Sequence, residues 1–417
     1  MNIKNTFRSL QYRNYLLFFS GQSISLIGTW TQRIATLWLV YRMTGSPLLL
    51  GVVGFAGQLP TFLMSPYAGV ITDRIDRYKV LLSTQVLAMI QAFILCILFF
   101  MHRIEVWQII TLGIVLGLIN AFDVPARQSL VIKMVDNKQD LGNAIALNSS
   151  MVNAARLIGP SIAGVLIVYF GEGYCFLING ISYLFVITTL LFIKIKPNVK
   201  LPDGKNIIQE FREGFYYTFS NITIRTLILL LALVSLVGMP YTILMPVFAG
   251  KILHGSSHTF GFLMAATGIG ALVGSLYMAS RKTVAGLEKL IPASTIIFGC
   301  GIIVFALSRN FYFSLFILLF TGLGMIFQMA ASNTIIQTIV DERKRGRVMS
   351  FYTMAFMGTA PFGSILAGWS ANLIGAPDTL VIGGFLCIAG AIAYLVVLPK
   401  ILKMLTLIYD QNKLDKK

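Results

Sequence analysis

Charge is scarce in this sequence. Only 12% of its 417 residues are Asp, Glu, Lys or Arg, and 56% are hydrophobic, whereas about a quarter of the residues of an ordinary soluble domain are charged. The shortage of charge excludes such a domain and indicates a membrane protein. Acidic residues are the scarcer class, with 16 against 33 basic ones. The basic excess does not predict a nucleic-acid partner, because Lys and Arg are scattered between apolar segments instead of forming one face.

Residue types that carry chemistry are also few. The four cysteines lie inside apolar runs without paired or metal-ligand spacing, so neither disulfides nor a metal site is predicted. His254 and His258 are four residues apart but have no third ligand nearby, so no metal is expected there either. No G-x-x-x-x-G-K-[ST] motif and no Ser, His and carboxylate set is present. We therefore predict no enzyme activity and no cofactor, and expect the energy to come from an ion gradient or from the substrate itself.

Long apolar runs are what the sequence has in abundance. A helix needs about 20 apolar residues to cross the hydrocarbon core of a membrane. Twelve such runs lie near 15–40, 47–72, 79–101, 105–128, 142–170, 174–194, 222–249, 258–280, 287–307, 311–337, 347–374 and 378–400. The first is too long for a signal-peptide core and is expected to be retained. The fold class predicted is all-α integral membrane, with twelve transmembrane helices.

The one long connection divides the runs into six and six. We predict an N-terminal six-helix bundle at 1–194, a cytoplasmic linker at 195–221, a C-terminal bundle at 222–400 and a cytoplasmic tail at 401–417. Apolar residues recur at helical spacing within the linker, which predicts an amphipathic helix in the membrane interface. Most Lys and Arg residues fall in the termini and alternate loops. Both termini are therefore predicted to be cytoplasmic in a multi-pass protein of a bacterial inner membrane.

The two halves contain related helices. Residues 141–171 align with 345–375 at an offset of 204 without a gap, which pairs four glycines: Gly142 with Gly346, Gly159 with Gly363, Gly164 with Gly368, and Gly171 with Gly375. Two pseudo-symmetric bundles with a site between them are typical of transporters, because rocking one half against the other exposes the site alternately to each side.

The stretch "GVITDRIDRYKV" at 69–80 lies between the second and third runs and follows a known signature. Its Gly69, Asp73, Arg74, Arg77 and Lys79 resemble the glycine, aspartate and basic pattern of the major facilitator superfamily. The resemblance implies the major facilitator fold, with this loop as a latch between the halves and its basic residues reaching a carboxylate on the fourth span. The candidate carboxylate is Asp123, four residues before Arg127 on the same helical face. A merely solvated loop is the alternative.

Two further stretches narrow the resemblance. "DVPARQ" at 123–128 and "RLIGPSIAG" at 156–164 are similar to the branch that contains enterobactin-type siderophore exporters and macrolide efflux proteins. In exporters of the superfamily, the element formed here by Gly159, Pro160 and Gly164 is associated with export. Small residues let two helices pack closely, and proline bends one of them.

Two cationic residues are predicted to lie deep in the spans. Charged residues inside a membrane are costly, so Arg33 in the first span and Arg156 in the fifth are candidate substrate-binding residues. Their neighbouring donors would be Gln22, Gln32, Asn148 and Asn153. Guanidinium binds carboxylate or catecholate oxygens in a forked geometry, which predicts an anionic or polyhydroxylated substrate. The alternative is that Arg33 extends to the interface and Arg156 binds helix carbonyls.

These features predict a secondary active exporter of a small organic molecule, siderophore-like or otherwise anionic or amphipathic, that works by alternating access. The resemblance implies a proton gradient as the energy source, with Asp123 as both proton site and latch, or with protons that travel with the substrate. Macrolide or multidrug efflux and lysophospholipid flipping are the alternatives. The expected partners are the small-molecule substrate and membrane lipid, and could include outer-membrane or periplasmic export components. We expect a monomer.

Overall fold

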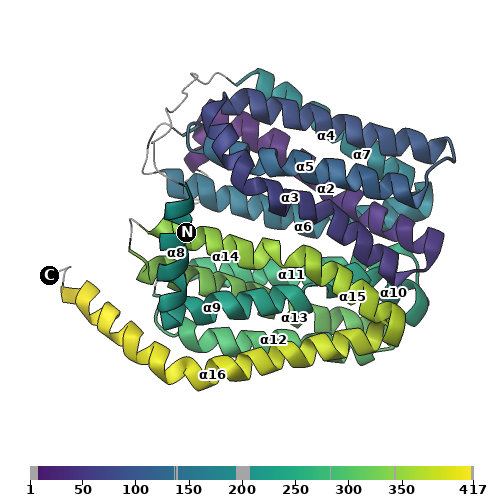
Figure 1. Cartoon of the computed structure of the whole chain (residues 1–417). Helices are drawn as coiled ribbons and strands as arrows, with labels where there is room; N and C mark the ends of the chain where they lie inside the picture. Colours follow the sequence, from purple (N-terminus) through teal and green to yellow (C-terminus); the bar gives the residue numbers. More distant parts are fainter. Residues whose placement is uncertain are drawn as a thin grey trace. The chain divides into compact units, whose positions relative to one another are not determined.

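The computed structural model describes the backbone of residues 8–135, 137, 140–193, 207–281, 283–341 and 344–414. Every regular element within these ranges is a helix (Figure 1). The first half contains a short 3-10 helix, η1 (Arg8–Gln11), and six long helices: α2 (Arg13–Thr44), α3 (Pro47–Arg74), α4 (Arg77–Phe100), α5 (Val106–Val131), α6 (Leu141–Phe170) and α7 (Glu172–Leu191).

The second half begins with α8 (Ile207–Ser220) and continues with spans that are partly interrupted. These are α9 (Ile222–Leu233), η3 (Val234–Gly238), α10 (Tyr241–Val247) and η4 (Phe248–Ile252), then α11 (Ser257–Ser280), α12 (Leu287–Leu307), α13 (Phe311–Ile339), α14 (Arg345–Thr353), η5 (Met354–Gly358), α15 (Ala360–Ile374) and α16 (Ala376–Leu414). Each of the twelve predicted spans corresponds to one helix or one interrupted helix, so the predicted fold class is confirmed.

Ten of these spans are long and apolar enough to cross a membrane by composition alone, counted over the described residues. The other two are α2 and the α14–α15 span. α2 contains Gln, Ser, Thr and Arg residues in its middle, and α14 begins with two arginines. Both are the polar members of the set, which is typical of helices that face protein or water more than lipid.

The chain divides into two compact units. Unit 1 comprises Met1–Asp203 and Met245–Ala265, and unit 2 comprises Gly204–Leu244 and Ala266–Lys417. Chain order alone placed residues 245–265 in the second bundle, whereas they pack with unit 1. The boundaries at 194, 221 and 400 between the bundles, the linker and the tail stay a prediction.

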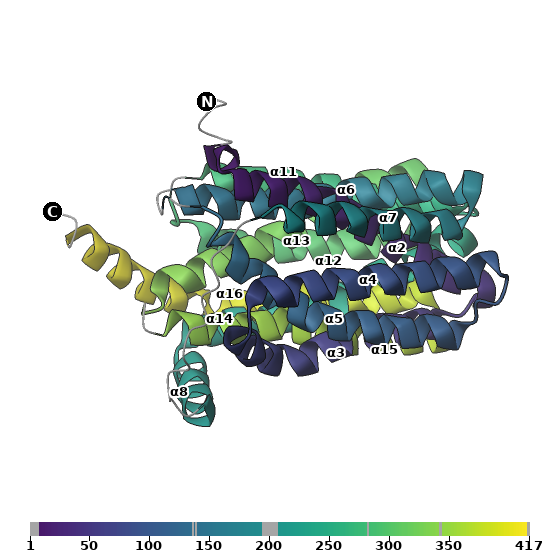
Figure 2. The same ribbon diagram turned by 90° about the horizontal axis from the view of Figure 1, so that it is seen from above.

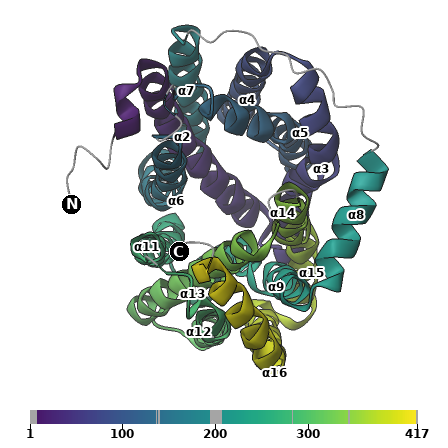
Figure 3. The same ribbon diagram turned by 90° about the vertical axis from the view of Figure 1, so that its left-hand side faces the viewer.

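Unit 1 is built around α2 and α7. α2 packs along α6 and α7, α4 packs on α5 and α7, and α3 packs on α5 (Figure 3). The buried core includes Tyr15 and Phe18 of α2 together with Tyr183 and Val186 of α7. These side chains form one apolar cluster, so the helices of this unit hold each other over most of their length.

Unit 2 is built around α12 and α16. α12 packs on α13 and α16, and α16 also contacts α9, η3 and α15. The last helix continues through Pro399 to Leu414, whereas the sequence prediction ended the span at residue 400. Proline removes one helical hydrogen bond and bends a helix without always ending it, and Figure 2 shows α16 bending toward its C-terminal end.

The repeat predicted from the sequence is visible in backbone geometry. Gly171 ends α6 with φ +85° and ψ 171°, and Gly375 ends α15 with φ +92° and ψ 154°. Their N–H groups donate to the carbonyls of Ile167 and Ala371, which are again 204 residues apart. A positive φ favours glycine, so the two equivalent helices α6 and α15 end with the same backbone conformation at a glycine.

One difference between the halves was not predicted. Within the described residues, the three π-helical segments η3, η4 and η5 all lie in the second half of the chain. The hydroxyl of Ser235 in η3 donates to the carbonyl of Phe356 in η5 at 2.6 Å. A π-helical turn displaces backbone carbonyls from the regular α pattern, and a neighbouring side chain satisfies one of them here.

The linker helix α8 runs across the ends of α9 and α14 instead of along them (Figures 1 and 2). Phe215 and Phe219 of α8 contact Phe351 of α14, with ring centroids 6.0 and 6.4 Å away. Gly214 lies against Arg347 and Phe351. The linker helix is therefore docked on unit 2 through aromatic contacts.

Candidate functional site

The crossing of α2 and α6 positions the predicted substrate residues. A Cβ added to Gly159 would lie 2.5 Å from the Cβ of Trp30 and 3.0 Å from the carbonyl oxygen of Ile27. The hydroxyl of Thr31 donates to the carbonyl of Gly159 at 3.2 Å. Only glycine fits at this position, so Gly159 of the predicted export element sets how closely α6 approaches α2.

Arg33 and Arg156 meet at one aromatic ring. Their guanidinium carbons lie 5.1 and 5.8 Å from the centroid of the Trp30 ring. The sequence prediction placed both arginines at one site but missed Trp30, whose signal was its spacing of three residues before Arg33 on the same helical face. An indole face attracts cations, so the ring holds two like charges close together.

The charge at this site is positive. Neither α2 nor α6 contains an acidic residue, and Arg33 is exposed in the structure. Two guanidinium groups on one ring repel each other, and a bound anion would relieve that repulsion. The arrangement is therefore suited to carboxylate or other oxyanion ligands.

The predicted amide neighbours fall into two groups. Gln22 is buried and Asn148 partly so, and the side-chain oxygen of each has no hydrogen-bond partner within the described part of the chain. A buried oxygen in that state is suited to accept a hydrogen bond from a hydroxyl or water. Asn153 is partly buried and donates to the carbonyl of Ser149 at 3.0 Å.

The amide of Gln32 is bound by two neighbouring helices. Its side-chain nitrogen donates to Gln91 of α4 at 3.0 Å, and its oxygen accepts from Asn179 of α7 at 2.8 Å. Gln32 is 4% exposed. Its amide is thus engaged on both sides inside the bundle, because a buried amide in an apolar surrounding must be satisfied by neighbouring helices. The role of Gln32 as a substrate donor stays a prediction, and its amide is bound to Gln91 and Asn179 in this structure.

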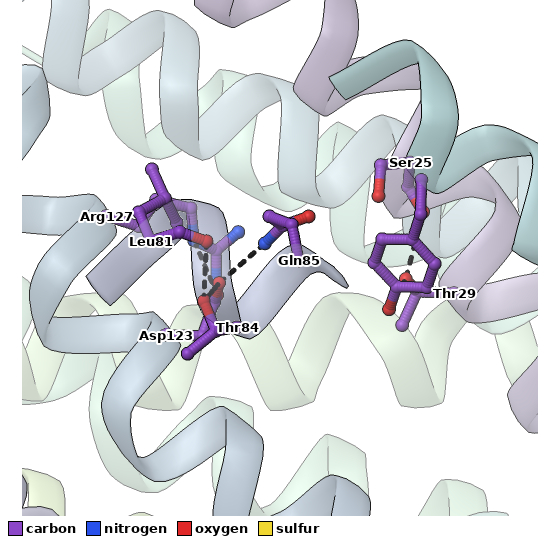
Figure 4. Close-up of polar contacts among 8 residues, drawn as sticks. Ser25, Thr29, Leu81, Thr84, Gln85, Asp123 and Arg127 are labelled. Atoms are coloured by element: carbon purple, nitrogen blue, oxygen red, sulfur yellow. Dashed lines mark hydrogen bonds and ion pairs between the residues drawn. The ribbon is translucent and has the colours of Figure 1, made fainter. Parts of the chain in front are cut away.

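Asp123 sits in a buried polar cluster on α5. It accepts from the hydroxyl of Thr84 at 3.0 Å and from the side-chain nitrogen of Gln85 at 2.6 Å, and it pairs with Arg127 at 3.4 Å (Figure 4). The sequence reasoning found Asp123 and Arg127 but missed Thr84 and Gln85, which belong to a run of three polar residues between apolar stretches of α4. The cluster ties α4 to α5 at this level.

The loop residues of the predicted latch are only partly described. Arg77 begins α4 and is partly buried, while Lys79 is exposed. Asp76 caps α4, accepting from the backbone N–H of Tyr78 at 3.0 Å. The side chains of Gly69, Asp73 and Arg74 lie outside the described residues, so the latch stays a prediction.

The export element uses two faces of α6. While Gly159 meets α2, Gly164 meets α11: a Cβ on Gly164 would lie 3.1 Å from the Cα of Gly261, and the hydroxyl of Ser257 donates to the carbonyl of Gly164 at 3.4 Å. The intervening Pro160 is buried, and a Cβ on Gly261 would lie 2.8 Å from its carbonyl oxygen. This packing explains why residues 245–265 belong to unit 1.

Asp140, just before α6, binds three residues of the N-terminal segment. Its carboxylate pairs with Arg8 at 2.9 Å and accepts from the phenol of Tyr12 at 2.8 Å, and its carbonyl accepts from the hydroxyl of Ser9 at 2.9 Å. The hydrogen bond to Asp140 raises the pKa of the Tyr12 phenol above its ordinary value. The sequence analysis did not single out this clamp, which fixes the start of α2 to the start of α6.

Comparison with known proteins decides the family. Residues 5–410 match a family described as transmembrane secretion effectors, one of the families of the major facilitator superfamily. The chain belongs to this family. The resemblance seen in the sequence is thereby confirmed, and transport across a membrane is the activity of the class.

Two curated relatives illustrate the range of the family. The staphyloferrin A transporter of Staphylococcus aureus is 27% identical over 370 residues, which cover 88% of this chain and 92% of that protein. Macrolide efflux protein A of Streptococcus pyogenes is 24% identical over 393 residues, covering 92% and 96%. The chain is thus similar along nearly its whole length to a siderophore transporter and to a drug efflux protein.

The fold is shared with solved transporters. A bacterial homologue of the human lysosomal transporter Spinster matches with a TM-score of 0.75 at 15% identity, covering 94% of this chain and 98% of that one. The nucleoside transporter NupG matches with a TM-score of 0.71 at 12% identity, covering 95% and 99%. At these identities the likeness concerns the fold alone.

Proposed function

We propose that this protein is a secondary active exporter of a small anionic organic molecule of the siderophore type, working by alternating access in a bacterial inner membrane with both termini in the cytoplasm. One observation carries the choice of substrate class: Arg33 and Arg156 share the Trp30 ring on two helices that have no acidic residue. A positive site of this kind favours carboxylate or catecholate oxygens and disfavours cationic drugs.

Macrolide or multidrug efflux is the second candidate. It is supported by the similarity to macrolide efflux protein A and to the multidrug efflux pump Tap of Mycolicibacterium fortuitum, which is 22% identical over 359 residues. The aromatic face of Trp30 could also stack on an apolar substrate. Flipping of a lysophospholipid is a third outcome that the same assay can detect.

The test is transport by purified protein in proteoliposomes with an imposed pH gradient. The probes are a polycarboxylate siderophore, a catecholate siderophore, erythromycin, tetraphenylphosphonium and a labelled lysophospholipid. Hydrogen bonds to charged groups contribute about 1.5–3 kcal/mol, so Arg33→Ala and Arg156→Ala should each lower anion transport roughly ten-fold or more.

The matched control is Arg103→Ala, which removes the same charge from an exposed loop residue and should leave transport unchanged. Arg33→Lys keeps the charge but loses the forked geometry of the guanidinium group. Its rate of anion transport should lie between those of the alanine variant and the intact protein. Efficient transport of tetraphenylphosphonium or erythromycin that neither alanine substitution alters would contradict the proposal.

A further inference from the structure

A second polar site lies in unit 2, whereas the arginine pair belongs to unit 1. An open pocket of about 490 Å³ is lined by Glu213, Tyr216 and Tyr217 of α8, by Ser220 and Asn221 at the turn into α9, and by Lys344 before α14. Neither the sequence analysis nor the proposed transport activity uses this pocket. Its size is within the range of small-ligand sites.

The pocket presents hydrogen-bond donors. The side-chain oxygen of Asn221 accepts from the N–H groups of Thr223 and Ile224 as the N-cap of α9, at 3.0 and 3.2 Å. This orientation leaves its amide nitrogen available as a donor. The hydroxyl of Ser220 and the phenols of Tyr216 and Tyr217 can donate as well. Several donors that line one pocket are suited to an oxyanion.

The charge of the pocket is also suited to an anion. The ammonium of Lys344 lies 4.3 Å from the centroid of the Tyr217 ring, which holds it at the pocket wall. The carboxylate of Glu213 pairs with Arg347 at 2.7 Å, so its negative charge is compensated. Arg345 follows Lys344 directly and is exposed. The net local charge is therefore positive.

The position of the pocket indicates the source of the anion. It lies where α9 and α14 begin, at the ends of two membrane spans, and the ends of spans meet the headgroups of the bilayer. Tyr216 is 76% exposed and Phe215 49% exposed on the same helix, and exposed aromatic residues at span ends are typical of the membrane interface. We propose that this pocket binds the phosphate group of an anionic membrane lipid.

The test is native mass spectrometry of the purified full-length protein titrated with dioleoyl phosphatidylglycerol or dioleoyl phosphatidylcholine. Lys344→Gln should raise the phosphatidylglycerol concentration at half-occupancy of the tightest bound lipid about five-fold, the effect of one lysine at an anionic surface. Lys289→Gln is the matched control, because Lys289 is an exposed lysine at the start of another span of unit 2, as Lys344 is, but does not line the pocket. It should bind phosphatidylglycerol as the intact protein does.

A second variant and a second ligand complete the design. Tyr217→Leu removes the ring that holds Lys344 and should weaken phosphatidylglycerol binding in the same direction, with phosphatidylcholine binding unchanged in every variant. Equal weakening by Lys344→Gln and Lys289→Gln, or none, would overturn the proposal. Binding of millimolar inorganic phosphate that depends on Lys344 without any preference for phosphatidylglycerol would assign the pocket to soluble phosphate compounds and overturn the lipid assignment.

Discussion

The two halves make the same helix crossing with different contents. In unit 1, Gly159 lets α6 approach the carbonyl of Ile27 in α2, and in unit 2 the equivalent Gly363 lets α15 approach the carbonyl of Leu236 in η3. The first crossing carries Trp30 and two arginines on uninterrupted helices. The second is uncharged, and both of its helices contain a π-helical segment.

This difference shows how a duplicated scaffold can be specialised. Charge is concentrated in the half whose helices are regular, where a rigid backbone can hold two guanidinium groups at one ring. Irregular backbone is concentrated in the half whose crossing carries no charge, and π-helical turns are frequent at functional sites. We infer that the first half supplies ligand charge and the second supplies backbone adaptability.

Deletion of a single residue should have the largest effect, and a different one in α6 than in η5. Asn153 of α6 and Met357 of η5 are equivalent at the offset of 204. One residue of an α-helix corresponds to about 100° of rotation and 1.5 Å of rise, so deletion of Asn153 should move Gly159 and Gly164 away from their partners and prevent folding. A π-helical turn contains one extra residue, so deletion of Met357 should instead restore an α-helix.

The measurement is monodispersity and thermal unfolding in detergent, followed by transport. Deletion of Met357 should shift the melting temperature by only roughly 2–4 °C but depress transport. Met357→Ala controls for loss of the side chain, which is 52% exposed. If both deletions leave equally folded protein, the assignment of different roles to the two helices is wrong.

Alanine at the two crossing glycines should have an intermediate effect. Overpacking typically costs about 1–3 kcal/mol, and Gly363→Ala should lie at the upper end because its nearest obstacle is the backbone of η3, whereas that of Gly159 is the Trp30 side chain. Gly159→Ala should also lower anion transport, since it displaces Trp30.

The molecule offers matched controls for this pair. Gly142 and Gly346 are equivalent to each other, and a Cβ at either meets nothing within 4 Å. Alanine at these exposed helix positions should be neutral or slightly stabilising. Thermal unfolding of all four variants checks the prediction, and equal shifts at crossing and control positions would refute it.

A small loss of stability is expected when Asp123 is changed. α13, the fourth span of the second half, has no charged residue, so the Asp123–Arg127 pair belongs to the first half alone. Asp123→Asn keeps an acceptor for Thr84 and Gln85 and should cost about 1–2 kcal/mol. It should depress turnover while leaving substrate affinity unchanged. Transport by this variant under an imposed pH gradient would exclude Asp123 as the proton carrier.

Most of the fold could be predicted from the lengths of the apolar runs and from the positions of the glycines. The ends of α3 and α12 follow from where apolar runs stop, and Gly171 and Gly375 could be matched because a positive φ selects glycine. The meeting of Arg33 and Arg156 followed from their cost in a membrane. These features depend on one residue type or on local composition.

Features that depend on which helices become neighbours could not be predicted. The sequence predicts Gln32 as a substrate donor. It does not reveal that the Gln32 amide forms hydrogen bonds with Gln91 and Asn179, which are far apart in the sequence. The π-helical turn of η5 could not be predicted from the alignment of 141–171 with 345–375, because that alignment has no gap. The extension of α16 beyond Pro399 depends on how one helix tolerates a lost hydrogen bond.

The Asp140 clamp has a consequence for how the chain is assembled during synthesis. α2 is made before the other spans of its unit, yet it is one of the two spans that are not apolar enough to be identified as membrane-crossing by composition. Its partners are α6 and α7, and its first residues are fixed by Asp140 and by the carbonyl of Ala144, which accepts from the phenol of Tyr15 at 2.8 Å.

More than 120 residues must therefore be made before α2 reaches its final neighbours, as the separation of 129 between Tyr15 and Ala144 shows. Contacts so distant in sequence form late. During that interval Arg33 must be accommodated without α6. α2 is thus held at its N-terminal end only after the start of the fifth span has been made.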